Sequence, residues 1–144
     1  MSYTRDELIP YVAGILDGEG CITINYRKGK KYLRPGIYIS NTSKDLMNFL
    51  SSFYPKWHRY ETEEDKIKNH KTKWEIRTWN TNNMIRCLEE LFPFLIVKKE
   101  HAKVMLKFLK LPNRNRQGRR KKVFTEKEMD LYRKLKILNR KGVN

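Results

Sequence analysis

The stretch Tyr11–Gly20, which reads YVAGILDGEG, decides the fold of this chain. It joins an apolar run containing small residues to two carboxylates, Asp17 and Glu19, that stand among glycines. The run Cys21–Arg27 follows at once, and its alternation of isoleucine with polar residues is typical of a half-buried strand. The sequence therefore predicts a helix that turns abruptly into a strand, with two acidic side chains at the junction.

The two acids are the first candidates for chemistry. Negative charge at a helix C-terminus opposes the helix dipole, so Asp17 and Glu19 are unfavourable there unless a cation or hydrogen bonds compensate. Magnesium is typically held by one or two carboxylates together with phosphate oxygens and waters, and it activates water for phosphodiester hydrolysis. The alternative is an ordinary amphipathic helix with an acidic, glycine-rich end. Ala13 and Gly14 lack bulk, so a second helix could approach the backbone closely there.

The composition points to a polyanionic partner. The 144 residues suffice for one domain with a real core, and hydrophobic residues make up 39%. The 32 basic and 16 acidic residues give a net charge of +16, for which nucleic acid is the first candidate partner. No apolar run is long enough to span a bilayer, so no membrane partner is expected.

The remaining composition favours an intracellular protein. The N-terminus is polar and acidic and does not read as a signal peptide, so secretion is not expected. Cys21 and Cys87 lie far apart without a CxxC or Cys/His pattern. We therefore interpret them as reduced thiols and expect no structural zinc. The choice between cytoplasm and an organelle matrix stays open.

The pattern along the chain predicts an α+β order of helix, two strands, helix, two strands and further helices. Asp6 is expected as the first N-cap rather than Thr4, because a start at Thr4 would place Pro10 deeper in the helix. The core is expected over about 6–110, with a basic connector at 112–122. The other predicted elements are strands Cys21–Arg27 and Tyr32–Ser40, helix Ser43–Tyr54, strands Trp57–Glu63 and Lys71–Thr78, and helices Asn80–Leu91, Val97–Leu109 and Thr125–Asn139.

The run VAGILDGEG at Val12–Gly20 resembles the signature of the LAGLIDADG homing endonucleases. The resemblance implies an αββαββα core whose four-stranded antiparallel sheet binds DNA, and extra helices would follow it. It implies that Glu19 holds a divalent metal, together with the backbone carbonyl of Gly18. Asp17 would mainly support the helix end and ranks below Glu19 as a ligand. The implied metal is Mg2+, and Mn2+ or Ca2+ could occupy the same site.

Two further segments resemble the family. In Ile39–Ser43 the matching residue is Asn41, which would help to order the nucleophilic water. In Pro93–Lys99 the matching residue is Lys98, which would stabilise charge near the scissile phosphate. The alternative for Asn41 is that it only caps a helix. The alternative for Lys98 is that it is one surface lysine among many.

The polar faces of the two hairpins are the candidate DNA-reading surface, because two-stranded ribbons fit the major groove. A basic run from Lys98 to Lys122 is interpreted as a phosphate-contacting flank, although a solvated helix face is the usual alternative. No histidine shows ligand spacing. The candidate DNA-binding residues are Thr23, Asn25, Arg27, Lys28, Lys30, Tyr32, Arg34, Tyr38, Arg59, Glu75, Arg77, Lys98, Lys99, Arg116, Arg119 and Arg120.

The chain carries a single copy of the signature, whereas cleavage of both DNA strands in this family uses two. The resemblance therefore implies a homodimer with an isologous interface and a roughly palindromic DNA site. The implied function is site-specific cleavage of double-stranded DNA, one phosphodiester per strand. The alternatives are a maturase that binds its host intron RNA and a DNA-binding protein without cleavage. The candidate interface residues are Tyr11, Ala13, Gly14, Leu16 and Asp17.

Overall fold

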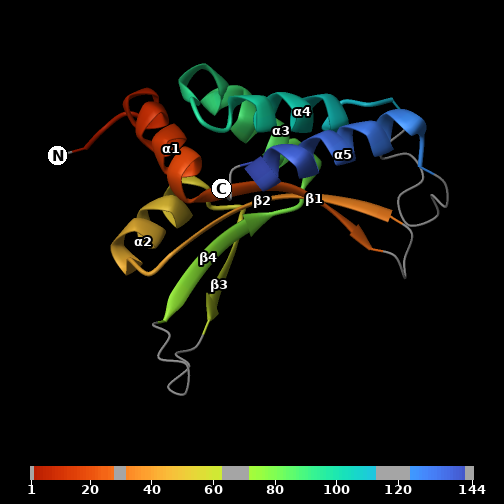
Figure 1. Cartoon of the computed structure of the whole chain (residues 1–144). Helices are drawn as coiled ribbons and strands as arrows, with labels where there is room; N and C mark the ends of the chain where they lie inside the picture. Colours follow the sequence, from red (N-terminus) through yellow and green to blue (C-terminus); the bar gives the residue numbers. More distant parts are fainter. Residues whose placement is uncertain (1, 28–31, 63–71, 113–123, 142–144) are drawn as a thin grey trace.

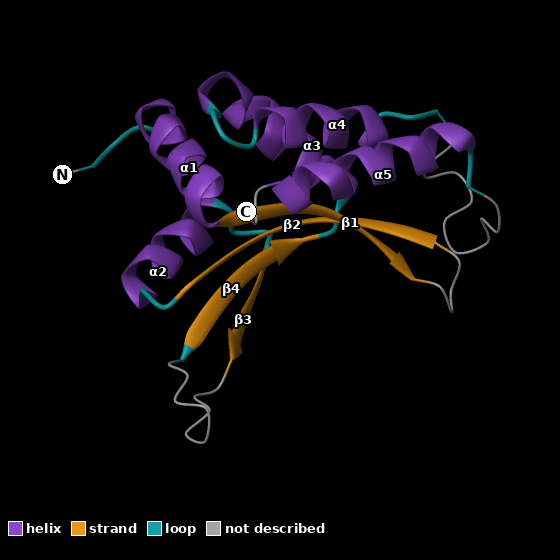
Figure 2. Cartoon of the chain, in the orientation of Figure 1, coloured by secondary structure: helices purple, strands orange, loops and turns teal. Residues whose placement is uncertain are grey.

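The computed structural model of the chain describes residues 2–27, 32–62, 72–112 and 124–141, without the side chains of residues 27, 32 and 141. Within these ranges, a four-stranded sheet carries helices packed on one of its faces (Figures 1 and 2). The predicted α+β class is confirmed. In chain order the elements are α1 (Arg5–Glu19), β1 (Gly20–Arg27), β2 (Tyr32–Asn41), α2 (Lys44–Phe53), β3 (His58–Thr62), β4 (Lys73–Thr78), α3 (Thr81–Leu91), the 3-10 helix η1 (Phe92–Phe94), α4 (Lys99–Leu109) and α5 (Glu126–Lys141).

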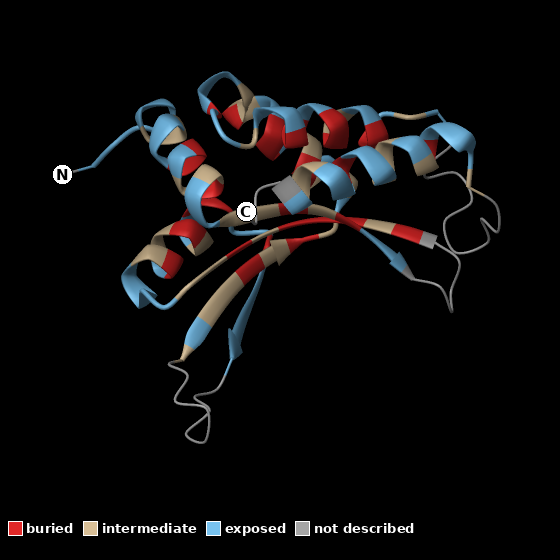
Figure 3. Cartoon of the chain, viewed as in Figure 1, coloured by how far each residue is buried: buried red, intermediate tan, exposed pale blue. Residues whose placement is uncertain are grey.

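The sheet is antiparallel with strand order β1-β2-β4-β3, so β1 and β3 form its edges. The register pairs Ile22 with Ile37 and Ile39 with Ile76, and these side chains are almost wholly buried beneath the helices. The opposite face of the sheet carries no helix. Below the helices in Figure 1, the β1–β2 and β3–β4 hairpins spread apart from each other. Figure 3 shows that burial concentrates between the sheet and the helices. We call the uncovered side the open face.

The first helix begins two residues earlier than the sequence indicates, and this corrects the prediction. Thr4 is the N-cap, because its Oγ1 accepts from the N–H of Glu7 (3.2 Å) and donates to Glu7 Oε1 (3.0 Å). Pro10 consequently lies inside α1, on an exposed side. The reciprocal capping bonds and the contacts of Arg5 offset the backbone hydrogen bond that a proline removes.

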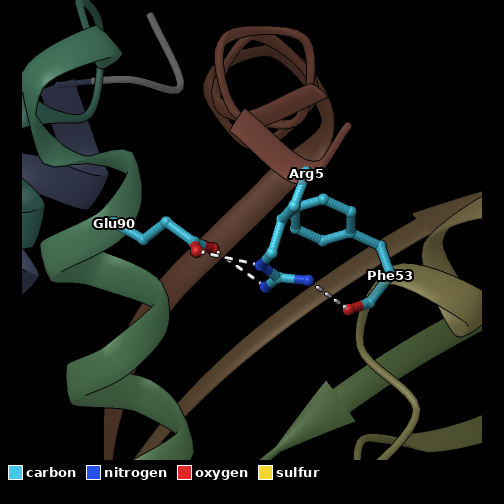
Figure 4. Close-up of polar contacts among 3 residues, drawn as sticks. All are labelled: Arg5, Phe53 and Glu90. Carbon is cyan, nitrogen blue, oxygen red and sulfur yellow. Dashed lines mark hydrogen bonds and ion pairs between the residues drawn. The ribbon is translucent and has the colours of Figure 1, made fainter. Parts of the chain in front are cut away.

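Arg5 connects three helices (Figure 4). Its Nε and Nη2 each donate to the carboxylate of Glu90 on α3 at 3.0 Å, and its Nη1 donates to the backbone carbonyl of Phe53 at 3.2 Å. The guanidinium also lies 3.9 Å from the centre of the Phe53 ring. The hydrogen bond with Glu90 raises the pKa of Arg5. This side chain fixes the start of α1 against α2 and α3.

The C-terminal helix α5 packs against α4 and along the edge strand β1. Its start is closed by a capping box, in which Glu128 N–H donates to Thr125 Oγ1 at 3.2 Å. The Asn139 amide donates to the carbonyl of Ile22 at 3.1 Å, which satisfies a backbone group on the sheet edge. No helix in the described ranges is long and apolar enough to cross a membrane.

Candidate active site and nucleic-acid interface

Helix α1 passes directly into β1, without an intervening loop residue. Gly20 makes this possible, because a Cβ at that position would collide with Leu16 Cδ1 and lie 2.8 Å from the Leu16 carbonyl oxygen. The Gly20 N–H instead donates to that carbonyl and closes the helix. Glu19 is thus the last helical residue, and its side chain is exposed. The junction holds the acid rigidly at one end of the sheet.

Asp17 binds the segment that precedes α4. Its Oδ2 accepts from the N–H of Ile96 (2.8 Å) and its Oδ1 from the N–H of Lys98 (2.9 Å). The Lys98 ammonium donates to the backbone carbonyl of Asp17 at 2.6 Å. These bonds hold residues 96–98 outside the helix, so α4 begins at Lys99 rather than at the predicted Val97. Both Asp17 oxygens are therefore engaged within the chain, whereas the exposed Glu19 forms no hydrogen bond or ion pair with the residues that the structure describes.

Asn41 lies at the end of β2 that faces this junction. Gly20 pairs with Ile39, so Asn41, two residues further along β2, lies beside the end of α1. Its Oδ1 accepts from the N–H of Ser43 at 2.8 Å, and Ser43 is the N-cap of α2. The register therefore places Asn41 at the same end of the sheet as Glu19, and Asn41 also takes part in the turn into α2.

The electrostatics of the α1 terminus suit a hard cation. The last turn of α1 holds no basic residue, and a helix C-terminus carries partial negative charge and unpaired carbonyls. Nothing lies within 4 Å of the position that a Cβ on Gly18 would take. Among the described residues, no three His, Cys, Asp or Glu side chains cluster to form an all-protein metal site. One exposed carboxylate and the Gly18 carbonyl fit a magnesium ion that completes its shell with phosphate oxygens and waters.

The open face gathers most of the candidate base-reading residues that the structure describes. Cross-strand pairs share a face, and Asn25–Arg34, Tyr38–Arg77 and Ser40–Glu75 all alternate with buried pairs. Thr23 is two residues before Asn25 on β1, so it lies on the same face. The sequence-based assignment of alternate residues of β4 to the outer side is therefore confirmed: Glu75 and Arg77 face away from the core.

Arg59 differs from the other candidates. It pairs with the buried Ile76, so it lies on the helix-covered side of the sheet. Its Nη1 donates to Asn48 Oδ1 (2.8 Å) and Ser51 Oγ (3.3 Å), both on α2. The reason is the pairing register: His58 pairs with Arg77 and Tyr60 with Glu75, so the even-numbered residues of β3 share the open face.

Aromatic side chains surround the arginines of the open face. The Arg34 guanidinium lies 4.0 Å from the centre of the Trp79 ring, and that of Arg77 lies 5.2 Å from it. Arg77 also forms an ion pair with Glu75 at 2.6 Å. A hydrogen bond with the Cys21 thiol, then partial burial, raises the pKa of Tyr38 to about 12, so this phenol stays protonated. We call Arg34, Tyr38, Glu75, Arg77 and Trp79 the arginine–tryptophan cluster.

Three further residues, His58, Tyr60 and Trp79, belong to this surface and are not among the candidates that the sequence indicates. His58 and Tyr60 lie 6.3 and 6.4 Å from the Trp79 ring, measured between ring centres. The available signal was alternation, because the outward positions 75 and 77 continue to 79 beyond the end of the strand. A tryptophan on a polar strand face is otherwise unexpected.

The residues proposed for a helix–helix interface divide into two groups. Ala13 and Leu16 are fully buried in the core of their own chain, so they are not on the exposed side of α1. Tyr11 is 57% exposed, and Gly14 is exposed with nothing within 4 Å of the position that a Cβ would take. Beside the end of α1, Ile96 is 84% exposed. Asp17 is half-buried against residues 96–98.

The other candidates are isolated or lie outside the described residues. Lys99 is exposed at the start of α4, 5.2 Å from the centre of the Phe92 ring. His101 is buried, and its Nδ1 has no hydrogen-bond partner. Burial and the charge of Lys98 lower the pKa of His101. Lys28, Lys30, Arg116, Arg119, Arg120 and His70, and the side chains of Arg27 and Tyr32, lie outside what the structure describes.

No known family profile and no curated protein matches the sequence. Solved structures do. The homing endonuclease I-CvuI, bound to its target in the presence of calcium, has a TM-score of 0.69 at 20% identity over 93% of this chain and 83% of its own. The group I intron-encoded homing endonuclease I-CeuI, complexed with DNA, has a TM-score of 0.71 at 13% identity, covering 94% of this chain and 69% of its own.

A third structure carries the family label. The LAGLIDADG meganuclease I-AabMI, bound to uncleaved DNA, has a TM-score of 0.62 at 16% identity, covering 89% of this chain and 43% of its own. The chain has the fold of the LAGLIDADG homing endonucleases. The resemblance seen in the sequence at Val12–Gly20 is thus confirmed at the level of the fold.

Proposed function

We propose that this protein is a site-specific DNA endonuclease of the LAGLIDADG homing type, which acts as a homodimer with a divalent metal. The observation that carries the proposal is the exposed Glu19 at the negative end of α1, with Lys98 hydrogen-bonded beside it at Asp17. This junction lies at one end of an open sheet face lined with Arg, Tyr and Asn. The net charge of +16 and the DNA-bound state of the similar structures support the same proposal.

Each residue of the junction has a distinct role in the proposed reaction. Glu19 and the Gly18 carbonyl would hold magnesium, which when bound activates water and stabilises the leaving oxygen of the phosphodiester. Lys98 stabilises negative charge that develops on the phosphate. An ammonium has three donors, and within the described ranges that of Lys98 donates one hydrogen bond, to the Asp17 carbonyl, so two donors remain for phosphate oxygens. Asn41 helps to order water from the β2 side.

Asp17 acts as a positioning residue in this scheme. Its carboxylate accepts two backbone N–H groups and thereby fixes the start of α4, including Lys98. Each Asp17 oxygen already accepts one backbone N–H, so Asp17 has fewer lone pairs to offer a metal than the exposed Glu19 has. We therefore assign the metal to Glu19 and the support of Lys98 to Asp17.

The exposed side of α1 is the proposed interface between the two copies. A glycine in the middle of a helix costs about 0.5–1 kcal/mol relative to alanine. Gly14 bears this cost although, apart from the adjoining backbone of its own helix, nothing lies within 4 Å of a Cβ position. Close approach of α1 from a second copy to this backbone would explain why a glycine stands at position 14. Tyr11 and the exposed Ile96 and Val97 would extend the same contact.

The open face would read the DNA. The eight residues of β1 span about 26 Å at about 3.3 Å per residue, which corresponds to about eight base pairs of duplex. Two copies related by a two-fold axis would therefore address a long, roughly palindromic site.

The decisive test is cleavage of DNA made by joining the sequences that flank the host intron of this reading frame. The wild-type chain is incubated with this DNA in magnesium and in EDTA, beside Glu19→Gln. We expect a discrete double-strand cut that requires both the metal and Glu19, while Glu19→Gln keeps its DNA affinity. Tight binding of the DNA without a cut in any divalent metal would overturn the endonuclease. Preferential binding of the intron RNA would then favour a maturase.

A further inference from the structure

We propose that Trp79 is a positioning residue that holds Arg34 ready to read a guanine in the DNA site. The inference rests on the DNA binding proposed above and deepens it, because it names one specificity contact and the residue that orients it. It is carried by the arginine–tryptophan cluster of the open face.

Trp79 lies directly against the backbone of the neighbouring strand. A Cβ on Gly36 of β2 would lie 3.1 Å from Trp79 Cδ1 and 3.3 Å from Trp79 Nε1. Both contacts are tighter than ordinary van der Waals distance, so a side chain at position 36 would displace the indole. The glycine therefore lets the ring settle onto the sheet, and the ring fills the space that a side chain would occupy.

Two arginines lie against this indole, and they differ in whether a carboxylate is paired with their charge. Arg77 is paired with Glu75 at 2.6 Å, and only 32% of its side chain is exposed. Arg34 lies closer to the ring, at 4.0 Å from its centre, and forms no ion pair with any carboxylate in the described part of the chain. Arg77 is thus neutralised within the protein, whereas the charge of Arg34 remains available to a ligand.

Stacking prepares Arg34 for recognition. A guanidinium that packs flat on an aromatic ring gains cation–π attraction and keeps its N–H donors in its own plane, at the rim of the stack. Less side-chain entropy is then lost when two of these donors bind one base edge. Guanine O6 and N7 in the major groove are the acceptors that match a bidentate arginine.

The register also places the recognised base. Arg34 pairs with Asn25, five residues along β1 from Gly20 at the metal end. At about 3.3 Å per residue this separation is about 16 Å, or about five base pairs. The expected guanine therefore lies about five base pairs outward from the cleavage position in each half-site.

The test is selection of bound duplexes from a pool with a long randomised segment, in Ca2+, followed by sequencing. It compares wild type, Arg34→Ala, Trp79→Ala and Trp79→Phe, with Arg133→Ala on α5 as a matched loss of one positive charge. We expect wild type and Arg133→Ala to enrich one guanine about 5- to 150-fold over the other bases. Arg34→Ala and Trp79→Ala lose this preference and keep the rest of the site. Trp79→Phe, which retains an aromatic surface, restores most of it.

The outcomes separate the inference from the proposed function. If wild type enriches a site and Trp79→Ala keeps the guanine with undiminished preference, the positioning role is overturned while DNA recognition stands. If wild type enriches no duplex sequence, the proposed function fails and the inference falls with it. Thermal unfolding of each variant shows whether the sheet is intact. If Trp79→Ala is unfolded, the comparison of Trp79→Phe with Arg34→Ala decides. The proposal is supported if folded Arg34→Ala loses the preference for guanine and Trp79→Phe retains it. Any other pattern contradicts the proposal.

Discussion

Lys98 contacts Asp17 twice, through its backbone N–H to Oδ1 at 2.9 Å and through its ammonium to the backbone carbonyl at 2.6 Å. Two segments separated by about 80 positions in the chain are thereby joined at the point where α1 ends and α4 begins. The two acids of the signature consequently have different environments: Asp17 is engaged within the chain, and Glu19 faces solvent.

Replacing Asp17 tests this structural role. Asp17→Ala removes the acceptor of two backbone N–H groups, and hydrogen bonds to charged groups are worth about 1.5–3 kcal/mol each. We expect Asp17→Ala to lower the free energy of unfolding by about 2 kcal/mol or more in urea titrations. Asp17→Asn keeps one carbonyl oxygen and should lose less. Unchanged stability of Asp17→Ala would contradict the assignment.

Lys98 is expected to act on the rate of cleavage more than on binding. Loss of one group that stabilises transition-state charge typically costs about 100- to 1000-fold in rate. Single-turnover cleavage by Lys98→Met should fall by about 100-fold, with DNA affinity changed only a few-fold. Lys103→Met, at an exposed lysine of α4, the helix that Lys98 precedes, is the matched control and should cleave normally. Equal rates for the two variants would remove Lys98 from the proposed chemistry.

The junction glycines should differ sharply in their tolerance of a methyl group. Gly20→Ala forces a Cβ against Leu16, and overpacking of this kind costs about 1–3 kcal/mol. Gly18→Ala meets nothing within 4 Å and lies in a helix, so its stability should stay equal or rise slightly. Thermal unfolding of the DNA-free proteins compares the two. Similar melting temperatures would show that the tight passage from α1 to β1 is not a constraint.

Gly14→Leu tests the interface between two copies. The substitution should leave the fold of a single chain intact, because nothing lies within 4 Å of the new Cβ. It should abolish the dimer in analytical ultracentrifugation and, with it, double-strand cleavage. A variant that remained dimeric and active would place the interface elsewhere.

Stability should fall on mild acidification because of His101. Burial, followed by the charge of Lys98, lowers its pKa below the ordinary value of about 6.5. The unfolded chain then binds a proton more readily than the folded one. This contribution to stability is complete above about pH 6.5 and is lost as the pH falls through the lowered native pKa. Urea unfolding at about pH 7.5 and 5.5 should show a smaller pH effect in His101→Gln than in wild type.

Much of the fold was readable from local patterns, and the misses have physical causes. Alternation of apolar residues assigned the inward side of the strands, and a small polar residue before each apolar run located the starts of α2 and α3 at Ser43 and Asn80. The start of α1 was wrong because the stabilisation that offsets Pro10 comes from distant partners of Arg5, which no local pattern shows.

The candidate site was readable only in part. The signature located the junction acids, and the structure places Lys98 and Asn41 at the same end of the sheet. Trp79 was missed because its role depends on Gly36 and Arg34, which become its neighbours only when β2 and β4 pair. Arg59 is expected on the open face because it is a basic residue of a hairpin, whereas its pairing with Ile76, which only the folded sheet defines, places it on the helix-covered side.

The absence of any loop residue between α1 and β1 has a consequence for discrimination between targets. Glu19 is joined directly to β1, the strand that would lie in the groove, and Leu16 packs against the connecting Gly20. A duplex that fits β1 poorly would shift this strand. Because no loop residue separates β1 from α1, Glu19 would move with the strand, away from the phosphate. We therefore expect the protein to bind near-cognate sites but to cleave them slowly, so that it discriminates between targets mainly at the cleavage step.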